Sequence, residues 1–189
     1  MSTYNVVAVS GNLGAPSRTL TLTQSILDAL SRLAPIDATI IELGKVGPLL
    51  GQSLNRKHLS ADAESVLTAV ESADLLVVAS PVYRATYTGL FKHLFDLVNH
   101  DALVEVPVVL AATGGSERHA LVLEHQLRPL FSFFRAHTVP TGIYATDADF
   151  DNYRLKSGQI EERINDAVRL AAKLLRSRSV AAPKLRALA

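Results

Sequence analysis

Short, almost continuous apolar runs alternate along the chain with segments in which apolar residues recur every three or four positions. The runs are rich in Val, Ile and Leu and lack the polar alternation of a half-exposed strand, so they indicate strands that are covered on both faces. Five strands are predicted on this basis, and the last has the weakest pattern: residues 4–10, 38–43, 74–80, 106–112 and 138–144.

The segments between these runs have helical spacing, as in the series Leu90, Leu94 and Leu97. Strands that alternate with helices are typical of a parallel sheet with helices on both faces. The sequence therefore predicts an α/β domain of five β/α units. The predicted helices cover residues 19–33, 61–72, 88–99, 118–136 and 159–177.

The length and composition favour a single domain. The chain has 189 residues, of which 48% are hydrophobic, and this is enough to bury a core of two or three layers. We predict that the domain covers residues 1–177. Residues 178–189 contain Pro183 and scattered basic side chains without a clear core face, and we predict either a disordered tail or an arm that contacts a neighbouring subunit.

The composition narrows the possible functions. Cysteine is absent, which excludes disulfides, thiolate metal sites and cysteine nucleophiles, and the histidines show no metal-ligand spacing. The net charge of +1 does not indicate the strongly basic surface that is typical of proteins that bind nucleic acid. No basic leader precedes an apolar run, and no apolar run reaches the roughly 18–20 residues of a membrane helix. We expect a cytoplasmic protein with small-molecule partners.

Small and hydrogen-bonding residues follow the first predicted strand and lead into the first helix. Gly11 and Gly14 allow close backbone approach, Ser17 is a natural N-cap, and Arg18 adds a cation where the helix exposes free amides. The loop therefore suits a phosphate, although an ordinary βα loop with a capped helix accounts for the same residues. The glycine patterns of pyrophosphate and triphosphate loops are missing, so we expect a terminal phosphate monoester.

Two further loops follow the third and fourth predicted strands. Pro81 stiffens the first of them, and Gly114 with Gly115 leaves room on the second for a flat ring to lie against the backbone. In open α/β sheets, ligands bind beyond the carboxyl ends of the strands at the point where the strand order reverses. The three loops together therefore predict a ligand site at this edge of the sheet.

These loops resemble the NADPH-dependent FMN reductase family, and in particular the reductase components of two-component alkanesulfonate and methanesulfonate monooxygenases. The resemblance extends over residues 4–175 and implies a flavodoxin-like three-layer sandwich with a five-stranded parallel sheet of order 2-1-3-4-5. Its motifs are Ser10-Gly11 through Ser17-Arg18, Pro81-Val82-Tyr83-Arg84 followed by Thr88-Gly89-Leu90-Phe91-Lys92, and Ala112-Thr113-Gly114-Gly115 with His119.

The resemblance also implies roles for the loop residues. The first loop would hold the FMN phosphate, the second would flank the isoalloxazine ring, and the third would complete the pocket. The chain departs from the family at Asn12-Leu13, where many members have Ser-x-Arg. His125 stands where alkanesulfonate-type members tend to have Tyr, so the chain is more similar to the methanesulfonate type. The implied residues are Ser10, Asn12, Ser17, Arg18 and Thr19 for the phosphate, Pro81, Val82, Tyr83 and Arg84 for the ring, and Thr113, Gly114, Gly115 and His119 for the rest.

The function implied is the transfer of hydride from NADPH or NADH to FMN, which leaves reduced to serve a partner monooxygenase. Such transfer needs no acid, base or nucleophile from the protein, and the family usually forms homodimers or homotetramers. Two alternatives share the fold. One is a quinone or azo reductase that retains its flavin, and the other is an electron carrier, which the net charge of +1 disfavours because carriers are commonly strongly acidic.

Overall fold

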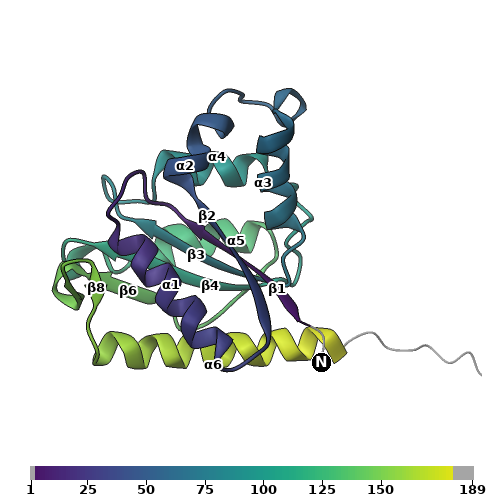
Figure 1. Cartoon of the computed structure of the whole chain (residues 1–189). Coiled ribbons are helices and arrows are strands. Elements are labelled where there is room, and N and C mark those ends of the chain that lie inside the picture. The colour runs from purple at the N-terminus through teal and green to yellow at the C-terminus, as the bar shows by residue number, and fades with distance from the viewer. Residues whose placement is uncertain (1–2, 181–189) are drawn as a thin grey trace, which may run out of the picture.

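A computed structural model describes residues 3–180 and contains one parallel sheet between two layers of helices (Figure 1). The strand order β2-β1-β3-β4-β5 confirms the predicted fold, with β6 also paired to β4. Every pairing in this sheet is parallel. The strands are β1 (Tyr4–Ser10), β2 (Ile36–Glu42), β3 (Leu75–Pro81), β4 (Pro107–Gly114), β5 (His137–Thr138) and β6 (Ile143–Thr146).

The sheet separates two hydrophobic cores. Val6 and Ala8 of β1 pack on one side, under α1 (Arg18–Ser31) and α6 (Gln159–Val180). Val7 and Val9 pack on the other side, under α2 (Leu43–Leu50), α3 (Ala61–Glu71), α4 (Gly89–Leu97) and α5 (Arg128–Phe133). Alternate residues of one strand thus serve opposite cores, which explains why the strands are apolar at nearly every position.

The predicted fifth strand is interrupted. Its residues form β5 and β6, which both pair with β4 and are separated by residues 139–142. Pro140 lies in this gap and has no amide hydrogen to donate to a neighbouring strand. The edge of the sheet is therefore made by two short strands.

The predicted helix over residues 118–136 is also divided. It consists of a 3-10 turn (Glu117–His119), one π-helical turn (Leu123–Leu127) and α5. Pro129, at the start of α5, cannot donate the bond that would continue a regular helix from the residues before it. His125 lies in the π-helical turn.

Several features were not predicted, among them the 3-10 turn Arg56–His58. Helix α2 follows β2 directly, and Gly47 within it packs so closely on α4 that an added Cβ would lie 2.5 Å from Leu90 Cδ1. A 3-10 turn (Asp147–Asp149) and a small hairpin of β7 (Phe150–Asp151) and β8 (Arg154–Leu155) follow β6.

The last helix runs further than predicted. The backbone of α6 continues to Val180, so the first three residues of the predicted tail are helical. Residues 181–189 lie outside the described part of the chain, and the division into a domain and a tail stays a prediction. None of the helices over residues 3–180 has both the length and the hydropathy that crossing a membrane requires.

Candidate functional site

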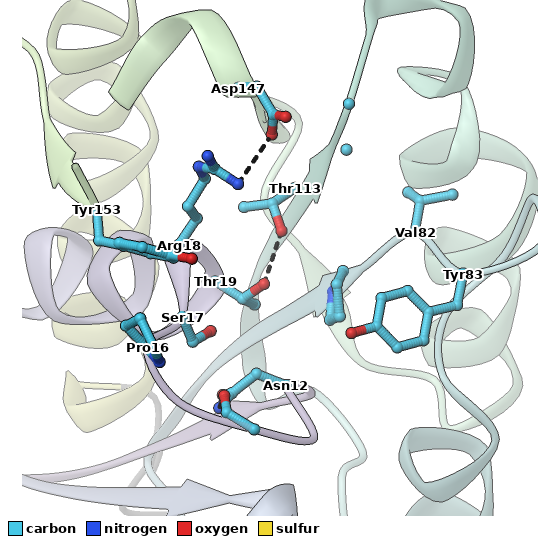
Figure 2. A pocket seen from close by; sticks show the side chains of 14 residues that line it. Asn12, Pro16, Ser17, Arg18, Thr19, Val82, Tyr83, Thr113, Asp147 and Tyr153 are labelled. Atoms are coloured by element: carbon cyan, nitrogen blue, oxygen red, sulfur yellow. Dashed lines mark hydrogen bonds and ion pairs between the residues drawn. The ribbon is translucent and has the colours of Figure 1, made fainter. Parts of the chain in front are cut away.

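The three predicted loops meet around a cavity of about 250 Å³ at the carboxyl edge of the sheet (Figure 2). Ten of the thirteen predicted site residues line it: Asn12, Ser17, Arg18, Thr19, Pro81, Val82, Tyr83, Thr113, Gly114 and Gly115. The remaining three, Ser10, Arg84 and His119, lie outside the lining. Four lining residues were not predicted as site residues, namely Gly14, Pro16, Asp147 and Tyr153.

The start of α1 lies on the left side of the cavity in Figure 2. Ser17 is the N-cap, as the sequence predicts, and its Oγ accepts a hydrogen bond of 3.1 Å from the amide of Leu20. The first turn of a helix has further amides without helical partners, and the helix dipole makes this end favourable for an anion. The geometry therefore suits a phosphate at Ser17, Arg18 and Thr19.

Ser10 does not line the cavity, but it supports the loop through a hydrogen bond to Asn12. Its buried hydroxyl donates to Asn12 Oδ1 at 2.6 Å, and Asn12 Nδ2 donates to the carbonyl oxygen of Gly14 at 3.1 Å. These bonds fix the side-chain amide of Asn12 against the loop backbone. In this structure Ser10 orients a lining residue and is not itself part of the lining.

The hydroxyl groups of Thr19 and Thr113 lie 2.6 Å apart and join the first turn of α1 to the end of β4. Both side chains are buried, and both contribute to the floor of the cavity. Two segments 94 residues apart in sequence are thereby held in a fixed relation. This contact positions the start of α1 relative to the end of β4.

The second loop brings Tyr83 to the side of the cavity opposite Arg18 (Figure 2). The Tyr83 amide donates to the Thr86 carbonyl oxygen at 2.8 Å, and Arg84 and Ala85 form the turn between them with φ of 52° and 72°. Positive φ at two residues that are not glycine is uncommon and costs conformational energy. The turn directs Tyr83 toward the cavity and places Arg84 at its exposed tip.

The third loop has two glycines with different surroundings. A Cβ on Gly114 would lie 2.1 Å from Tyr144 Oη, and this hydroxyl donates to the carbonyl oxygen of Ser116 at 2.8 Å. Burial, together with the charges of Glu117 and Asp147, raises the pKa of Tyr144, so the phenol keeps its proton. A Cβ on Gly115 would meet nothing within 4 Å. Gly115 thus leaves open backbone in the cavity wall.

His119 lies beyond this loop, in the 3-10 turn Glu117–His119. That turn faces a second cavity, of about 410 Å³, which includes Glu117 and Tyr144 in its lining. His119 lines neither of these two cavities.

A fourth wall comes from the segment after β6. Asp147 Oδ1 lies 3.3 Å from Arg18 Nη1, and the Arg18 guanidinium carbon lies 5.1 Å from the centre of the Tyr153 ring. The rule that ligands bind beyond the carboxyl ends of parallel strands applies to this segment too. It was missed because the fifth strand has a weak pattern and its true end is not evident from the sequence.

The donors and open surfaces fit a phosphate monoester joined to a flat ring. The start of α1, with the hydroxyls of Ser17 and Thr19 and the Arg18 guanidinium, lies on one side of the cavity, and Tyr83 lies on the opposite side (Figure 2). Gly115 also lines the cavity. The cavity is smaller than the roughly 300–1,000 Å³ of sites that enclose a drug-sized ligand, so an occupant of FMN size would remain partly exposed. Within residues 3–180, no group of three acidic or histidine side chains could hold a metal ion.

Comparison with known proteins agrees with this geometry. The family model described as NADPH-dependent FMN reductase matches residues 4–151, which include all three predicted loops. A Pseudomonas aeruginosa protein named FMN reductase (NADPH) is 56% identical over 178 residues, which are 94% of this chain and 96% of that protein. A Pseudomonas fluorescens protein named NADH-dependent FMN reductase SfnF is 57% identical over 169 residues, which are 89% and 90% of the two chains.

A solved structure has the same architecture. An oxidoreductase from Corynebacterium diphtheriae superposes with a TM-score of 0.84 at 35% sequence identity. The match covers 93% of this chain and 98% of that chain. The likeness therefore extends over the sheet, both helical layers and the loops that line the cavity.

Proposed function

The chain belongs to the NADPH-dependent FMN reductase family, and we infer that it is an NAD(P)H:FMN oxidoreductase. The observation that carries this conclusion is the match over residues 4–151, because it includes the three loops that meet around the cavity. FMN accepts hydride at N5 from C4 of the nicotinamide, and with one proton this gives reduced FMN and the oxidised dinucleotide. The protein's contribution is to hold the two rings in register and to exclude water.

The phosphate of FMN is proposed to bind at the start of α1. The free amides of the first turn, the Ser17 hydroxyl and the Arg18 guanidinium support this position. Asn12 lines the same end and is held by Ser10 and Gly14. The helix dipole adds to the attraction for an anion.

The isoalloxazine ring is proposed to lie between Tyr83 and the Gly114-Gly115 backbone. The Tyr83 side chain is 49% exposed where it lines the cavity, so its ring is accessible for stacking. Gly115 presents backbone with no neighbouring atom within 4 Å of a Cβ position. Pro81 and Val82 complete this side of the cavity.

FMN is proposed to act as an exchangeable substrate that leaves reduced, for use by a partner monooxygenase. The cavity leaves part of a bound FMN exposed, and tyrosines supply the aromatic cover because the chain has no Trp. The sulfonate monooxygenase partner rests on the family resemblance of the loop motifs. The cytoplasmic location and the homodimer or homotetramer stay predictions.

The choice between NADPH and NADH is not decided by similarity, since relatives of 56% and 57% identity are named for different dinucleotides. Steady-state oxidation of NADPH and NADH, each with FMN, FAD and riboflavin as acceptors, tests the proposed function. We expect oxidation that saturates with FMN. Oxidation that does not depend on added flavin would contradict the proposal.

A further inference from the structure

The two charged side chains in the cavity lining are paired with each other. Arg18 is the single cation and Asp147 the single carboxylate among the residues that line the cavity. Their closest atoms, Arg18 Nη1 and Asp147 Oδ1, are 3.3 Å apart (Figure 2). The formal charge of a lining proposed to receive a phosphate is therefore zero.

The pairing is loose. A distance of 3.3 Å is longer than the roughly 2.7–2.9 Å of a strong charge-assisted hydrogen bond. The side chains of Arg18 and Asp147 are 39% and 58% exposed, and pairs so exposed are weak because water screens them. Arg18 Nε is buried and has no hydrogen-bond partner among residues 3–180. The guanidinium thus has donor capacity that Asp147 does not use.

Asp147 is not needed to hold its own turn. Asp149 Oδ2 accepts hydrogen bonds from the amide of Thr146 at 2.7 Å and from its hydroxyl at 2.9 Å, and the bond from the amide is part of the capping box of the turn. The Asp147 carboxylate is instead directed toward Arg18 (Figure 2). An uncharged residue at position 147 should therefore leave the turn intact.

Tyr153 holds Arg18 from another side. Its ring centre is 5.1 Å from the guanidinium carbon, a cation–π contact made from the turn of the β7–β8 hairpin. This contact keeps the guanidinium at the cavity wall, where both Asp147 and an incoming anion reach it. Arg18 is therefore placed to exchange one anionic partner for another.

We propose that Asp147 sets the affinity for FMN by competing with its phosphate for the Arg18 guanidinium. This inference rests on the proposed function and identifies a residue that weakens binding, so that flavin is released after reduction. Because the competition is for the phosphate, it acts on FMN and not on riboflavin, which has the same ring and no phosphate.

The substitution Asp147→Asn tests the proposal, since it removes the charge and keeps the shape. The dissociation constants for FMN and riboflavin are measured by quenching of flavin fluorescence. We expect FMN to bind about three- to tenfold more tightly to the variant, in keeping with the removal of one exposed ion pair and of the repulsion between two anions. Riboflavin binding should change by less than about twofold.

Two further variants locate the effect. Asp151→Asn removes an equal charge from β7, just after the turn that contains Asp147 and outside the cavity lining, and should leave both dissociation constants unchanged. In an Arg18→Ala background, Asp147→Asn should lose most of its effect if the two residues act through each other. Circular dichroism of each variant confirms that the fold is retained, and Asp147→Ser provides a second neutral side chain.

The results separate this inference from the proposed function. Wild-type protein that reduces FMN, with an unchanged FMN dissociation constant in Asp147→Asn and Asp147→Ser, would overturn the competition alone. Equal tightening of FMN and riboflavin would also overturn it, because Asp147 would then act on the ring. Wild-type protein that does not reduce FMN would overturn the proposed function itself.

Discussion

At the residue scale, Arg18 is the first residue of α1, and its guanidinium pairs with Asp147 and lies over the Tyr153 ring. The sequence indicated a cation beside free helix amides. It did not indicate that a carboxylate far along the chain shares that cation. The proposed competition for the FMN phosphate therefore depends on a contact between segments separated by more than a hundred residues.

Replacing Arg18 with Ala should weaken FMN binding by about tenfold, which is near the lower end of the loss expected for a hydrogen bond to a charged group because the guanidinium is partly exposed. Riboflavin binding should hardly change. Arg32→Ala, at the other end of α1, is the matched control. Equal losses of FMN and riboflavin affinity would mean that Arg18 supports the loop or the ring and does not bind the phosphate.

The two glycines of the third loop should respond differently to Ala. Gly114→Ala places a Cβ 2.1 Å from Tyr144 Oη, so it should displace that side chain and lower the free energy of unfolding by about 1–3 kcal/mol. Gly115→Ala meets nothing within 4 Å and should leave stability unchanged while raising KM for FMN. Chemical denaturation and steady-state kinetics measure the two effects, and an unchanged KM in Gly115→Ala would argue against a ring at this position.

At the scale of the elements, Arg56 joins three segments. From the 3-10 turn Arg56–His58 it binds Glu64 and Glu71 of α3, and Glu71 also accepts a 2.7 Å hydrogen bond from the amide of Asn99, beyond α4. Burial alone would raise the pKa of Glu71, but the bonds from Arg56 and Asn99 outweigh it, and the pKa lies below its ordinary value. These contacts stabilise the side of the domain that lies away from the cavity wall formed by α1.

A lowered pKa in the folded state means that the carboxylate stabilises the fold above its unfolded pKa and loses this contribution as pH falls through the folded pKa. Arg56→Gln should therefore lower the free energy of unfolding by about 1 kcal/mol near neutral pH, with a smaller difference in acid as Glu71 becomes protonated. Denaturation over a pH series measures this. Lys92→Gln, which removes a pair confined to one exposed helix face, should have a smaller effect; a difference for Arg56→Gln that is independent of pH would contradict the assignment to Glu71.

The helices and strands differ in how well the sequence predicts them. Strands β1, β3 and β4 are buried apolar runs, so their ends and the three loops were found from the pattern. The prediction depends on periodicity, and prolines and glycines break it. Pro140 divides the predicted strand over residues 138–144, and Pro129 divides the predicted helix over residues 118–136. Helix α2 was not predicted because it contains Gly47 and Pro48. The fourth wall of the site follows one of these irregular segments, and for that reason Asp147 and Tyr153 were not predicted.

At the scale of the whole molecule, the parallel sheet brings the ends of β1, β3, β4 and β6 to one edge, and the cavity forms there. The proposed positions of the phosphate at α1 and of the ring at Gly115 suit a flavin that enters and leaves from solvent. The zero net charge of the lining agrees with the proposed release after each turnover. We therefore propose that free FMN is a substrate of the protein.

Reduction of a large molar excess of FMN in the absence of oxygen tests this claim most directly. Protein, FMN and either NADPH or NADH are mixed, and the loss of visible flavin absorbance is followed to completion. We expect all the FMN to be reduced, at a rate proportional to protein concentration. Reduction that stops at one flavin per protein chain, or that fails with both dinucleotides, would contradict it.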